Sequence, residues 1–285
     1  MIGLGSNRLS VCRRGGMSVT QAGRGGMEWL AGGRRPRWSS PYSAQATAAL
    51  KAQFPTQWPT IRDYGVSHPE IVGYMNAYAP EDAKIAYSLV PTLNVRRYLV
   101  GDGKVWFETG ITTEYTKMSF EVGAALTRAL SGEYEMFGNY SGSNQGITAG
   151  HYNTNRAFMY ASGGNSNVVV SDLQAYHLYK FVIDANNGIF STECDGTVAN
   201  ISKAYNLYAR NATIKFMDGQ TFNLNKGFYK FTHFDMTYGD NGHKHYIPFL
   251  HEDGNDTIPC MLELISGTIA YNQGSGTPTI SESPS

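Results

Sequence analysis

Short runs of alternating apolar and polar residues fill the chain from residue 97 onward. The closing stretch, residues 246–279, shows this pattern most clearly, because turns at Gly254, Ser266-Gly267 and Gly274-Ser275-Gly276 separate its apolar runs. Glycine, aspartate and asparagine supply the backbone dihedrals of tight turns between strands. The stretch therefore predicts three consecutive strands of an antiparallel sheet.

The same alternation predicts further strands upstream. Short strands at this spacing, separated by turns, are typical of a two-sheet jelly roll. We therefore expect a mostly β chain, an antiparallel β-sandwich, preceded by an extended arm with short helices. The predicted segments are 98–100, 105–109, 118–122, 134–137, 156–160, 168–170, 179–183, 188–192, 206–210, 212–216 and 227–236.

The segment 227–236 carries large rings at both alternating sets of positions. Rings on both sets indicate that both faces of the strand are covered, as in the middle of a sheet. We therefore expect 227–236 to be a central strand. The two sets are Phe228, Lys230, Thr232 and Phe234, and Tyr229, Phe231, His233 and Asp235.

Two helical patterns precede the strands. Residues 43–54 are rich in alanine and predict a short helix, which the two prolines of 54–59 should end. The run 67–70, Ser-His-Pro-Glu, matches a capping box and predicts a second helix. We interpret His68 as a surface residue of its first turn. The helix has an apolar stripe that needs a partner, either the following domain or another copy of the chain: Ile71, Val72, Met75 and Tyr78 or Ala79.

The charge distribution separates the N-terminus from the rest. The formal net charge is zero, yet residues 1–37 carry seven arginines against the single acid Glu28. We predict an anchoring arm over 1–41, a helical linker or assembly segment over 42–96 and the jelly roll over 97–285. The arm should order against neighbouring subunits, and nucleic-acid binding is a minor alternative. The predicted anchoring residues are Arg13, Arg14, Arg24, Trp29, Arg34, Arg35 and Trp38.

Composition supports a turn-rich β protein. The chain has 32 Gly, 19 Tyr and only 16% charged residues. Cys12, Cys194 and Cys260 show neither a paired framework nor a zinc-ligand spacing, so we expect free thiols. No apolar run approaches the roughly 20 residues of a membrane span. Residues 1–9 lack the features of a secretory signal, so we do not expect export by the general secretion route.

Two segments resemble a known family. Residues 98–111, Tyr-Leu-Val-Gly-Asp-Gly-Lys-Val-Trp-Phe-Glu-Thr-Gly-Ile, resemble the opening strands of the concanavalin A-like (laminin G-like) jelly rolls of gut bacteria and their phages. Ile247-Pro248, Pro259-Cys260-Met261 and residues 271–277 resemble their ending. The resemblance covers 97–279 and implies the fold. It does not settle function, since the fold hosts lectins, glycanases and structural modules.

Carboxylate pairs offer only a weak case for a glycanase. A glycanase of this fold would need Glu-x-Asp-x-x-Glu along one strand, to hold an acid and a nucleophile about 5–5.5 Å apart. Glu133 and Glu135 share a strand face but lack the other members, and a solvated face or turn explains them better. Glu193 and Asp195 have the same spacing beside a predicted turn.

Metal binding is likewise a weak prediction. His243, His245 and His251 cluster in sequence with Asp240 and Asp253, and a His-x-His pair can bind metal, but no third fixed ligand is apparent. We therefore expect no metal cofactor. Calcium is the weak alternative, on a turn with hard oxygen ligands. Its candidates are Asp253, Asn255 and Asp256.

Sugar binding requires an aromatic face with amide or carboxylate groups nearby. Two predicted loops offer that mixture, although ordinary loop residues would look the same. The candidate glycan-contact residues are Tyr140, Asn144, Gln145, Tyr152 and Asn153.

The sequence favours a virion structural protein. A surface-type jelly roll without a secretory signal can leave the cell in a phage particle released by lysis. We predict a non-enzymatic, oligomeric component of a capsid, head fibre, collar or tail, made in the host cytoplasm and located in the virion. Its partners would be other virion proteins and its own copies, with host-surface or mucosal glycans as ligands and no membrane partner. The alternatives are a bacterial carbohydrate-binding lectin module and, less favoured, a glycoside hydrolase.

Overall fold

The computed structural model describes residues 40–78, 90, 95–128, 132–141, 145–152, 155–161, 164–202, 211–217, 225–226 and 228–284. Residues 42–285 form one compact unit, which holds three helices and both sheets of the described chain. Within the described residues, no helix is long and apolar enough to cross a membrane.

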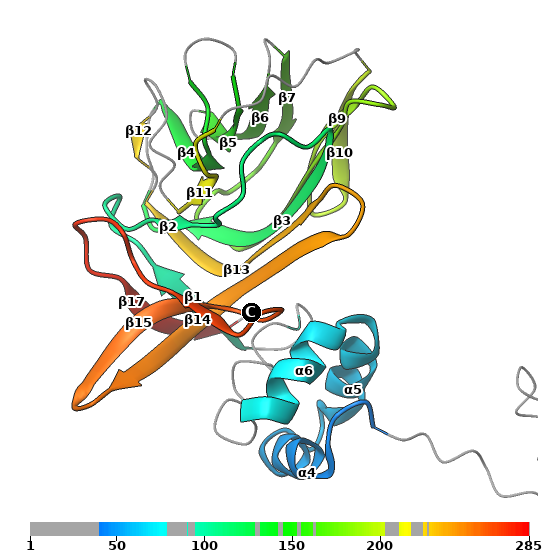
Figure 1. Cartoon of the computed structure of the whole chain (residues 1–285), viewed down its shortest axis with the longest axis vertical. Helices are drawn as coiled ribbons and strands as arrows, with labels where there is room; N and C mark the ends of the chain where they lie inside the picture. Colours follow the sequence, from blue (N-terminus) through cyan, green and yellow to red (C-terminus); the bar gives the residue numbers. More distant parts are fainter. Residues whose placement is uncertain are drawn as a thin grey trace, which may run out of the picture. The chain divides into compact units, whose positions relative to one another are not determined.

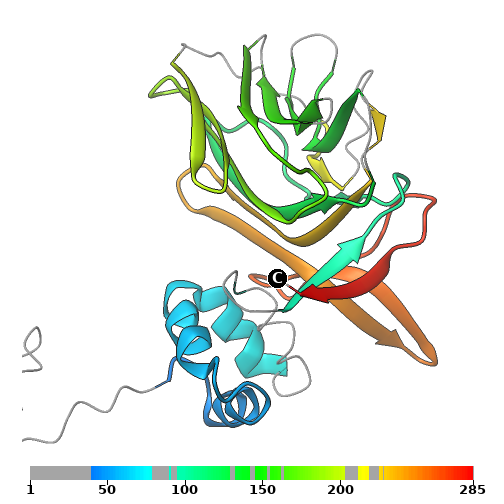
Figure 2. The ribbon, with the colours of Figure 1, turned by 180° about the vertical axis from the view of Figure 1, so that it is seen from behind.

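The strands form two sheets that face each other (Figures 1 and 2), in which all pairs are antiparallel except the parallel pair β4–β12. The described residues give a ten-stranded sheet, ordered β10-β9-β8-β3-β13-β14-β15-β16 with β1 and β17 attached, and a seven-stranded sheet, ordered β2-β11-β4-β5-β6-β7 with β12 attached. The strands of the larger sheet are β1 (Val95–Val100), β3 (Lys117–Leu126), β8 (His177–Asp184), β9 (Ile189–Cys194), β10 (Thr197–Ser202), β13 (Tyr229–Tyr238), β14 (Gly242–Asp253), β15 (Asp256–Glu263), β16 (Thr268–Ala270) and β17 (Thr279–Pro284). Those of the smaller sheet are β2 (Phe107–Glu108), β4 (Glu133–Gly138), β5 (Ile147–Tyr152), β6 (Arg156–Ala161), β7 (Gly164–Val169), β11 (Lys215–Phe216) and β12 (Asn225–Lys226).

The predicted jelly roll is confirmed, and the strand predictions within the described residues all contain part of a strand. The closing stretch forms the consecutive strands β14, β15 and β16. The predicted segment 206–210 lies outside the described residues. The sequence did not predict β5, β10, β12 or β17. In β5, Gly150 resembles a turn signal but is needed because a Cβ there would overlap the carbonyl oxygen of Tyr134.

The two ends of the described jelly roll pair with each other. β1 runs antiparallel to β17, from Val95 opposite Pro284 to Val100 opposite Thr279. The following loops also join, because the Trp106 amide donates to Asn272 Oδ1 at 3.0 Å and the Gly276 amide donates to the Lys104 carbonyl at 3.0 Å. The closing stretch therefore fixes the start of the domain.

Aromatic rings from both sheets meet in the core between them. Phe137 of β4 lies 4.5 Å from Phe120 of β3 and 5.4 Å from Phe234 of β13, measured between ring centroids. Phe216 of β11 stacks on Phe234 at 4.5 Å. Burying such rings supplies most of the driving force for folding of a sandwich.

A β-bulge in β13 changes which residues face this core. β13 is central, between β3 and β14, as predicted. Its register against β3 shifts between Phe231 and His233, so Thr232 is an extra residue. The predicted strict alternation is therefore wrong beyond Phe231. Phe234 joins Phe231 in the core, whereas Asp235 faces the opposite side of the sheet.

Among the described residues, three helices precede the sandwich. α4 (Ala44–Gln53) and α6 (Pro69–Tyr78) confirm the two predicted helices, and the prolines do follow the end of α4. The sequence missed α5 (Trp58–Ser67), because Pro59 falls in its first turn, where proline is tolerated. The predicted capping box is wrong: Ser67 ends α5, and its hydroxyl donates to the Asp63 carbonyl.

The apolar stripe of α6 packs on the chain's own sheet. Ile71 and Met75 are buried in a second hydrophobic cluster with Ile247 of β14 and Leu262 of β15. Of the two partners that we considered, the following domain is the one observed. The helices therefore cover the face of the larger sheet that lies opposite the sandwich core.

The junction between the first and last segments of the jelly roll has no room for an added methyl group at Gly274. A Cβ at Gly274 would overlap the Lys104 carbonyl oxygen, whereas a Cβ at Gly73 in α6 has nothing within 4 Å. We expect Gly274→Ala to lower the free energy of unfolding by about 1–3 kcal/mol through overpacking. Gly73→Ala should raise it by up to about 1 kcal/mol, because alanine favours helix. Urea unfolding of both variants checks this, and equal stability of Gly274→Ala and the parent would contradict it.

A buried histidine gives stability a dependence on pH. His151 of β5 is fully buried, with Nδ1 2.9 Å from the Tyr229 hydroxyl. Burial, helped by His177, lowers the pKa of His151 from 6.5 to about 3. Between these values the unfolded chain binds a proton that the folded chain excludes, so stability is lost as pH falls below 6.5.

We expect His151 to account for about 2 kcal/mol of the unfolding free energy lost between pH 7 and pH 5. Urea unfolding at both pH values should show a smaller loss for His151→Gln than for the parent. His251→Gln, which removes a partly exposed histidine of β14, is the control. An unchanged pH dependence in His151→Gln would rule out this role.

Candidate functional site

A row of charged side chains crosses the larger sheet on the face opposite the core. Glu121 of β3 is the register partner of Lys180 on β8 and of Asp235 on β13. Asp235 is in turn the partner of His245 on β14. Directly opposed residues project from the same face, so the four side chains form one cross-strand ladder.

Ion pairs connect the ladder and its neighbours. Lys180 Nζ lies 3.3 Å from Glu121 Oε2, and Asp235 Oδ2 lies 2.9 Å from His245 Nδ1. Asp235 Oδ2 also accepts a hydrogen bond from His243 Nε2 at 2.9 Å. The same carboxylate oxygen thus contacts two imidazoles on neighbouring β14 positions of one face.

The helices complete the site from the other side. Glu70, in the first turn of α6, places Oε1 3.3 Å from His245 Nδ1, and its side chain is only 7% exposed. Tyr64 near the end of α5 stacks on His68 with ring centroids 3.7 Å apart and an angle of 12°. His68, predicted to be a surface residue, is half-buried and forms part of this wall.

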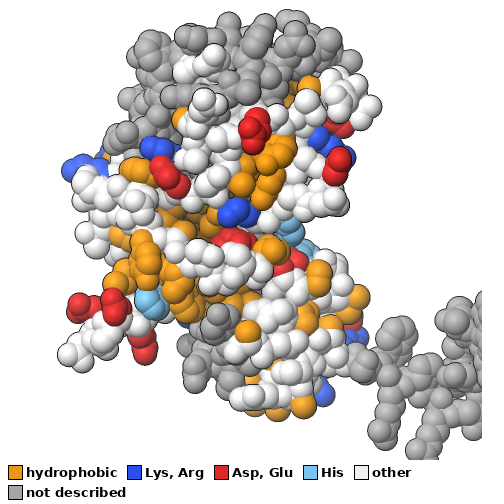
Figure 3. Space-filling model, viewed as in Figure 1, with side chains coloured by type: hydrophobic (Ala, Val, Ile, Leu, Met, Phe, Trp, Pro, Cys, Tyr) orange, Lys and Arg blue, Asp and Glu red, His pale blue; other side chains and the backbone are white. Residues whose placement is uncertain are grey.

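Sheet and helices enclose a cleft of about 470 Å³. Figure 3 shows histidine, acidic and basic side chains gathered in the hollow between the sandwich and the helices. The floor comes from β3, β8, β13 and β14, and the wall from residues 64–70. The lining residues are Tyr64, Ser67, His68, Pro69, Glu70, Ser119, Phe120, Glu121, Lys180, Val182, Asp235, Thr237, His243 and His245.

The charges shift one another's pKa. Burial would lower the pKa of His245, but Asp235 and Glu70 raise it to about 9. Burial would raise the pKa of Asp235 and Glu70, but their histidine partners hold both below the ordinary carboxyl value. The hydrogen bond to Asp235 raises the pKa of His243. The site therefore pairs the Asp235 and Glu70 carboxylates with a His245 imidazolium at neutral pH.

Three side chains of the cleft have metal-ligand geometry. One ligand atom from each of Asp235, His243 and His245 lies within 4.8 Å of the other two. The sequence indicates the two histidines as candidate ligands but shows no third ligand beside them. Counting outward from the β13–β14 turn would have placed Asp235 opposite His245, whereas Glu70 lies too far along the chain for any sequence signal.

The other members of the predicted histidine cluster lie elsewhere. His251 is on β14 like His245 but lies six residues further along the strand. Its Nδ1 is 2.6 Å from the Tyr271 hydroxyl. Six residues of strand span about 20 Å. Asp240 is in the β13–β14 turn and Asp253 is at the opposite end of β14, so neither lines the cleft.

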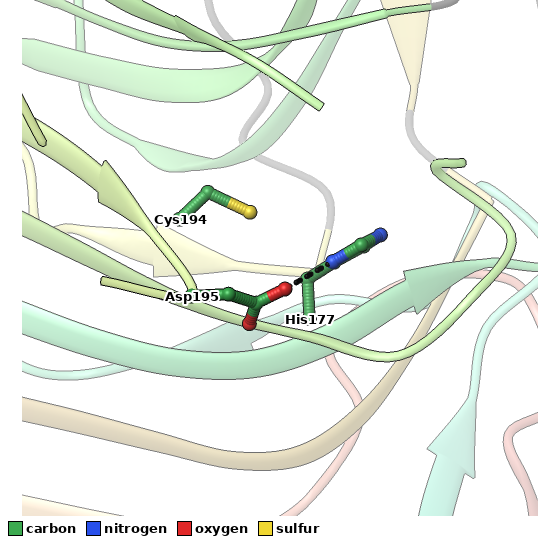
Figure 4. Close-up of side chains that lie close together, drawn as sticks. All are labelled: His177, Cys194 and Asp195. Atoms are coloured by element: carbon green, nitrogen blue, oxygen red, sulfur yellow. Dashed lines mark hydrogen bonds and ion pairs between the residues drawn. The ribbon is translucent and has the colours of Figure 1, made fainter. Parts of the chain in front are cut away.

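A second group of potential metal ligands is already engaged. Asp195 is turned toward the His177 ring in Figure 4, with Oδ2 2.6 Å from Nδ1. His177 Nε2 contacts the Asp172 carbonyl at 2.5 Å. Burial, with Asp195 and Glu193 nearby, raises the pKa of the Cys194 thiol to about 12. These contacts give His177, Cys194 and Asp195 a structural role at the β9–β10 turn, because both imidazole nitrogens already have hydrogen-bond partners and the thiol stays protonated. We call these three residues the clasp.

The predicted glycan-contact residues do not gather in one place. Tyr140 follows β4 and packs edge-on against Tyr160 at 4.9 Å, near the exposed Gln145. Tyr152 ends β5, where it packs against Phe158 at 6.0 Å. The two tyrosines lie at opposite ends of β5, so a ligand at one does not reach the other. Asn144 and Asn153 lie outside the described residues.

The predicted carboxylate pairs do not form a cleft. Glu135 is fully buried on β4 and accepts a hydrogen bond from Thr148 Oγ1 at 2.8 Å, so the expectation of a solvated position is wrong for this residue. Glu133 is half-buried at the start of β4. Asp195 accepts the Leu178 amide at 2.8 Å, which ties it to the clasp.

The calcium candidates lie at a hairpin tip. Asp253 and Asp256 are register partners on β14 and β15, and both are exposed together with Asn255. Gly254 takes a positive φ of 64° to make the turn. The predicted anchoring residues, from Arg13 to Trp38, lie outside the described residues.

Comparisons with known proteins give the fold. No protein-family model matches the chain, and no curated protein matches it in sequence. A Bacteroides ovatus protein whose name proposes carbohydrate binding matches with a TM-score of 0.50 at 10% identity. That match covers 67% of this chain, which spans 62% of the other protein. The chain thus has the concanavalin A-like jelly-roll fold that its opening and closing segments predict.

Two further matches have lower TM-scores. The CBM40 of a Ruminococcus gnavus IT-sialidase, bound to α2,3-sialyllactose, gives 0.35 at 7% identity and covers 46% of this chain and 84% of that one. A heptameric pentraxin from Limulus polyphemus gives 0.40 at 9% identity and covers 67% and 95%.

The structural reading of the clasp can be tested by alkylation. Cys194 is 6% exposed and its thiol has a raised pKa, so little reactive thiolate is present. We expect iodoacetamide at pH 8 to leave Cys194 unmodified in the folded protein and to modify it in urea. Peptide mass spectrometry measures this residue separately from Cys12 and Cys260. Rapid modification of native Cys194 would contradict the structural role.

Proposed function

We propose that the protein binds carbohydrate without catalysis, and that the cleft between α5 and the larger sheet is the binding site. The proposal rests on the composition of this cleft. An aromatic surface lies there beside charged side chains that can replace their ion pair with hydrogen bonds to a ligand. The lectin-like fold makes this role reasonable, since folds of this kind host lectins as well as other functions.

The cleft has the size and chemistry that a sugar requires. Its volume of about 470 Å³ lies within the usual range for small-ligand sites. The stacked rings of Tyr64 and His68 present an aromatic surface for the apolar face of a sugar. Ser119 and Thr237, joined by a hydrogen bond of 2.6 Å, add hydroxyl groups on the floor.

Lys180 and Glu121 would bind sugar hydroxyls. Their side chains are 43% and 35% exposed, so the ion pair between them is a weak, partly solvated one. A sugar hydroxyl can donate to the carboxylate and accept from the ammonium group at little cost. The buried Glu70 and His245 lie behind this open part of the cleft.

The absence of catalysis and the virion role are also proposals. A glycanase would need Glu135 as a catalytic carboxylate. Its burial and the hydrogen bond that it accepts from Thr148 support a structural role for this residue instead. The virion role depends on residues 1–41, nearly all of which lie outside the described residues. It therefore stays a prediction from the sequence, and the lectin reading has the better support.

A glycan array with the full-length chain tests the proposal, followed by calorimetry with the best ligand. Lys180→Met should weaken binding about tenfold or more, the effect of losing a charged hydrogen bond. Lys117→Met, on the same sheet but outside the cleft, is the matched control and should bind like the parent. Binding to no glycan would overturn the proposed function.

The variants also separate the competing sites and classes. If Tyr152→Ala or Tyr140→Ala abolishes binding and Lys180→Met does not, the loops rather than the cleft bind the sugar. Release of sugar products that Glu133→Gln or Glu135→Gln abolishes would instead establish a glycanase.

A further inference from the structure

The buried end of the cleft contains a histidine whose ring nitrogens are unsatisfied. His245 is 4% exposed, and among the described residues neither its Nδ1 nor its Nε2 has a partner with hydrogen-bond geometry. Buried polar groups are normally bonded, and an unsatisfied one carries a desolvation cost. Asp235 and Glu70 nevertheless crowd its Nδ1, at 2.9 and 3.3 Å.

Two carboxylates lie beside the His245 ring, and one of them, Asp235, also contacts His243. The side chains of Asp235 and Glu70 are 22% and 7% exposed, so both negative charges are largely removed from water. Buried charges of one sign require compensation, which a protonated His245 supplies only in part. A divalent cation in place of that proton would bind His245 Nδ1 and supply the second positive charge.

The spacing of the donor atoms suits a tetrahedral ion. Ligand bonds of 2.0–2.1 Å in a tetrahedral zinc site place neighbouring donor atoms about 3.3 Å apart. Here the separations are 2.9 Å from Asp235 Oδ2 to each histidine nitrogen and 3.3 Å from Glu70 Oε1 to His245 Nδ1. Asp235 and the two histidines therefore need shifts of only a few tenths of an ångström, whereas Glu70 lies outside this group of three and would move toward it to bind the ion.

The donor set selects the kind of metal. Two imidazole nitrogens with carboxylate oxygens suit zinc and related transition-metal ions, whereas calcium and magnesium prefer oxygen ligands alone. The fold presents these donors for a structural reason. His243 and His245 are two residues apart on β14 and so share a face, and Asp235 is the register partner of His245 across the hairpin.

We propose that Asp235, His243, His245 and Glu70 bind a zinc ion that ties α6 to the β13–β14 hairpin. The first three ligands come from one hairpin and the fourth from a helix more than 160 residues earlier in the chain. The ion acts as a cross-link between the helices and the sandwich, and it holds the wall of the cleft against its floor. The site is separate from the more exposed Lys180 and Glu121.

The test uses the full-length chain, stripped with chelator and titrated with ZnCl₂ alone. We expect one zinc per chain by elemental analysis and a higher melting temperature with zinc. His243→Ala and Glu70→Gln should each weaken zinc binding tenfold or more. His251→Ala removes an imidazole from the same strand outside the site and should bind zinc like the parent.

Cobalt provides a measurement that does not depend on the variants folding. Co²⁺ bound by nitrogen and oxygen in tetrahedral geometry should give strong visible absorption without a thiolate charge-transfer band. A thiolate band would place the metal at Cys194 or another cysteine and would overturn the proposal. So would the absence of stoichiometric zinc binding, or zinc binding that His243→Ala leaves unchanged.

Zinc and glycan binding are measured separately, so the two proposals can fail independently. Zinc titrations contain no sugar, and the glycan array is run with and without chelator. Loss of glycan binding in chelator would show that the ion shapes the cleft, whereas unchanged glycan binding would confine the ion to the helix–sheet junction.

Discussion

The extra residue in β13 is the constraint on which both faces of the larger sheet depend. Without the shift at Thr232, Phe234 would leave the core and Asp235 would enter it. Burying an unpaired carboxylate there would cost far more than the ring contacts contribute. Gly123 on β3 makes the bulge possible, because a Cβ at this position would overlap Thr232 and the His233 ring.

Once the bulge has set the faces, the helices have a defined surface to cover. Ile71 and Met75 of α6 bury apolar area against β14 and β15, which holds the helical segment beside the charged ladder. Glu70 stands at the start of that helix and therefore faces His245. The cleft thus forms because an amphipathic helix packs beside a row of charged side chains. The order of the strands determines which charged side chains line it.

Local patterns were sufficient for most elements but failed where context changed their meaning. Pro59 resembled a helix breaker because its role depends on its position within a turn of helix. The strand β5 was not predicted, because a glycine needed for close strand contact, such as Gly150, has the same sequence signal as a glycine needed for a turn. Glu135 looked solvent-exposed because alternation alone does not reveal a buried acceptor for Thr148.

The sequence by itself determined the two-sheet jelly roll, the central position of β13 and the presence of two helices. The strands follow from period-two alternation and turn residues, and the helices from composition and apolar positions at helical spacing, all of which act over a few positions. Only the tertiary structure decided that Glu70 joins Asp235 and the two histidines, and that Tyr140 and Tyr152 lie apart. Those outcomes depend on strand register, on a one-residue bulge and on where a helix docks, and none of these is encoded in local spacing.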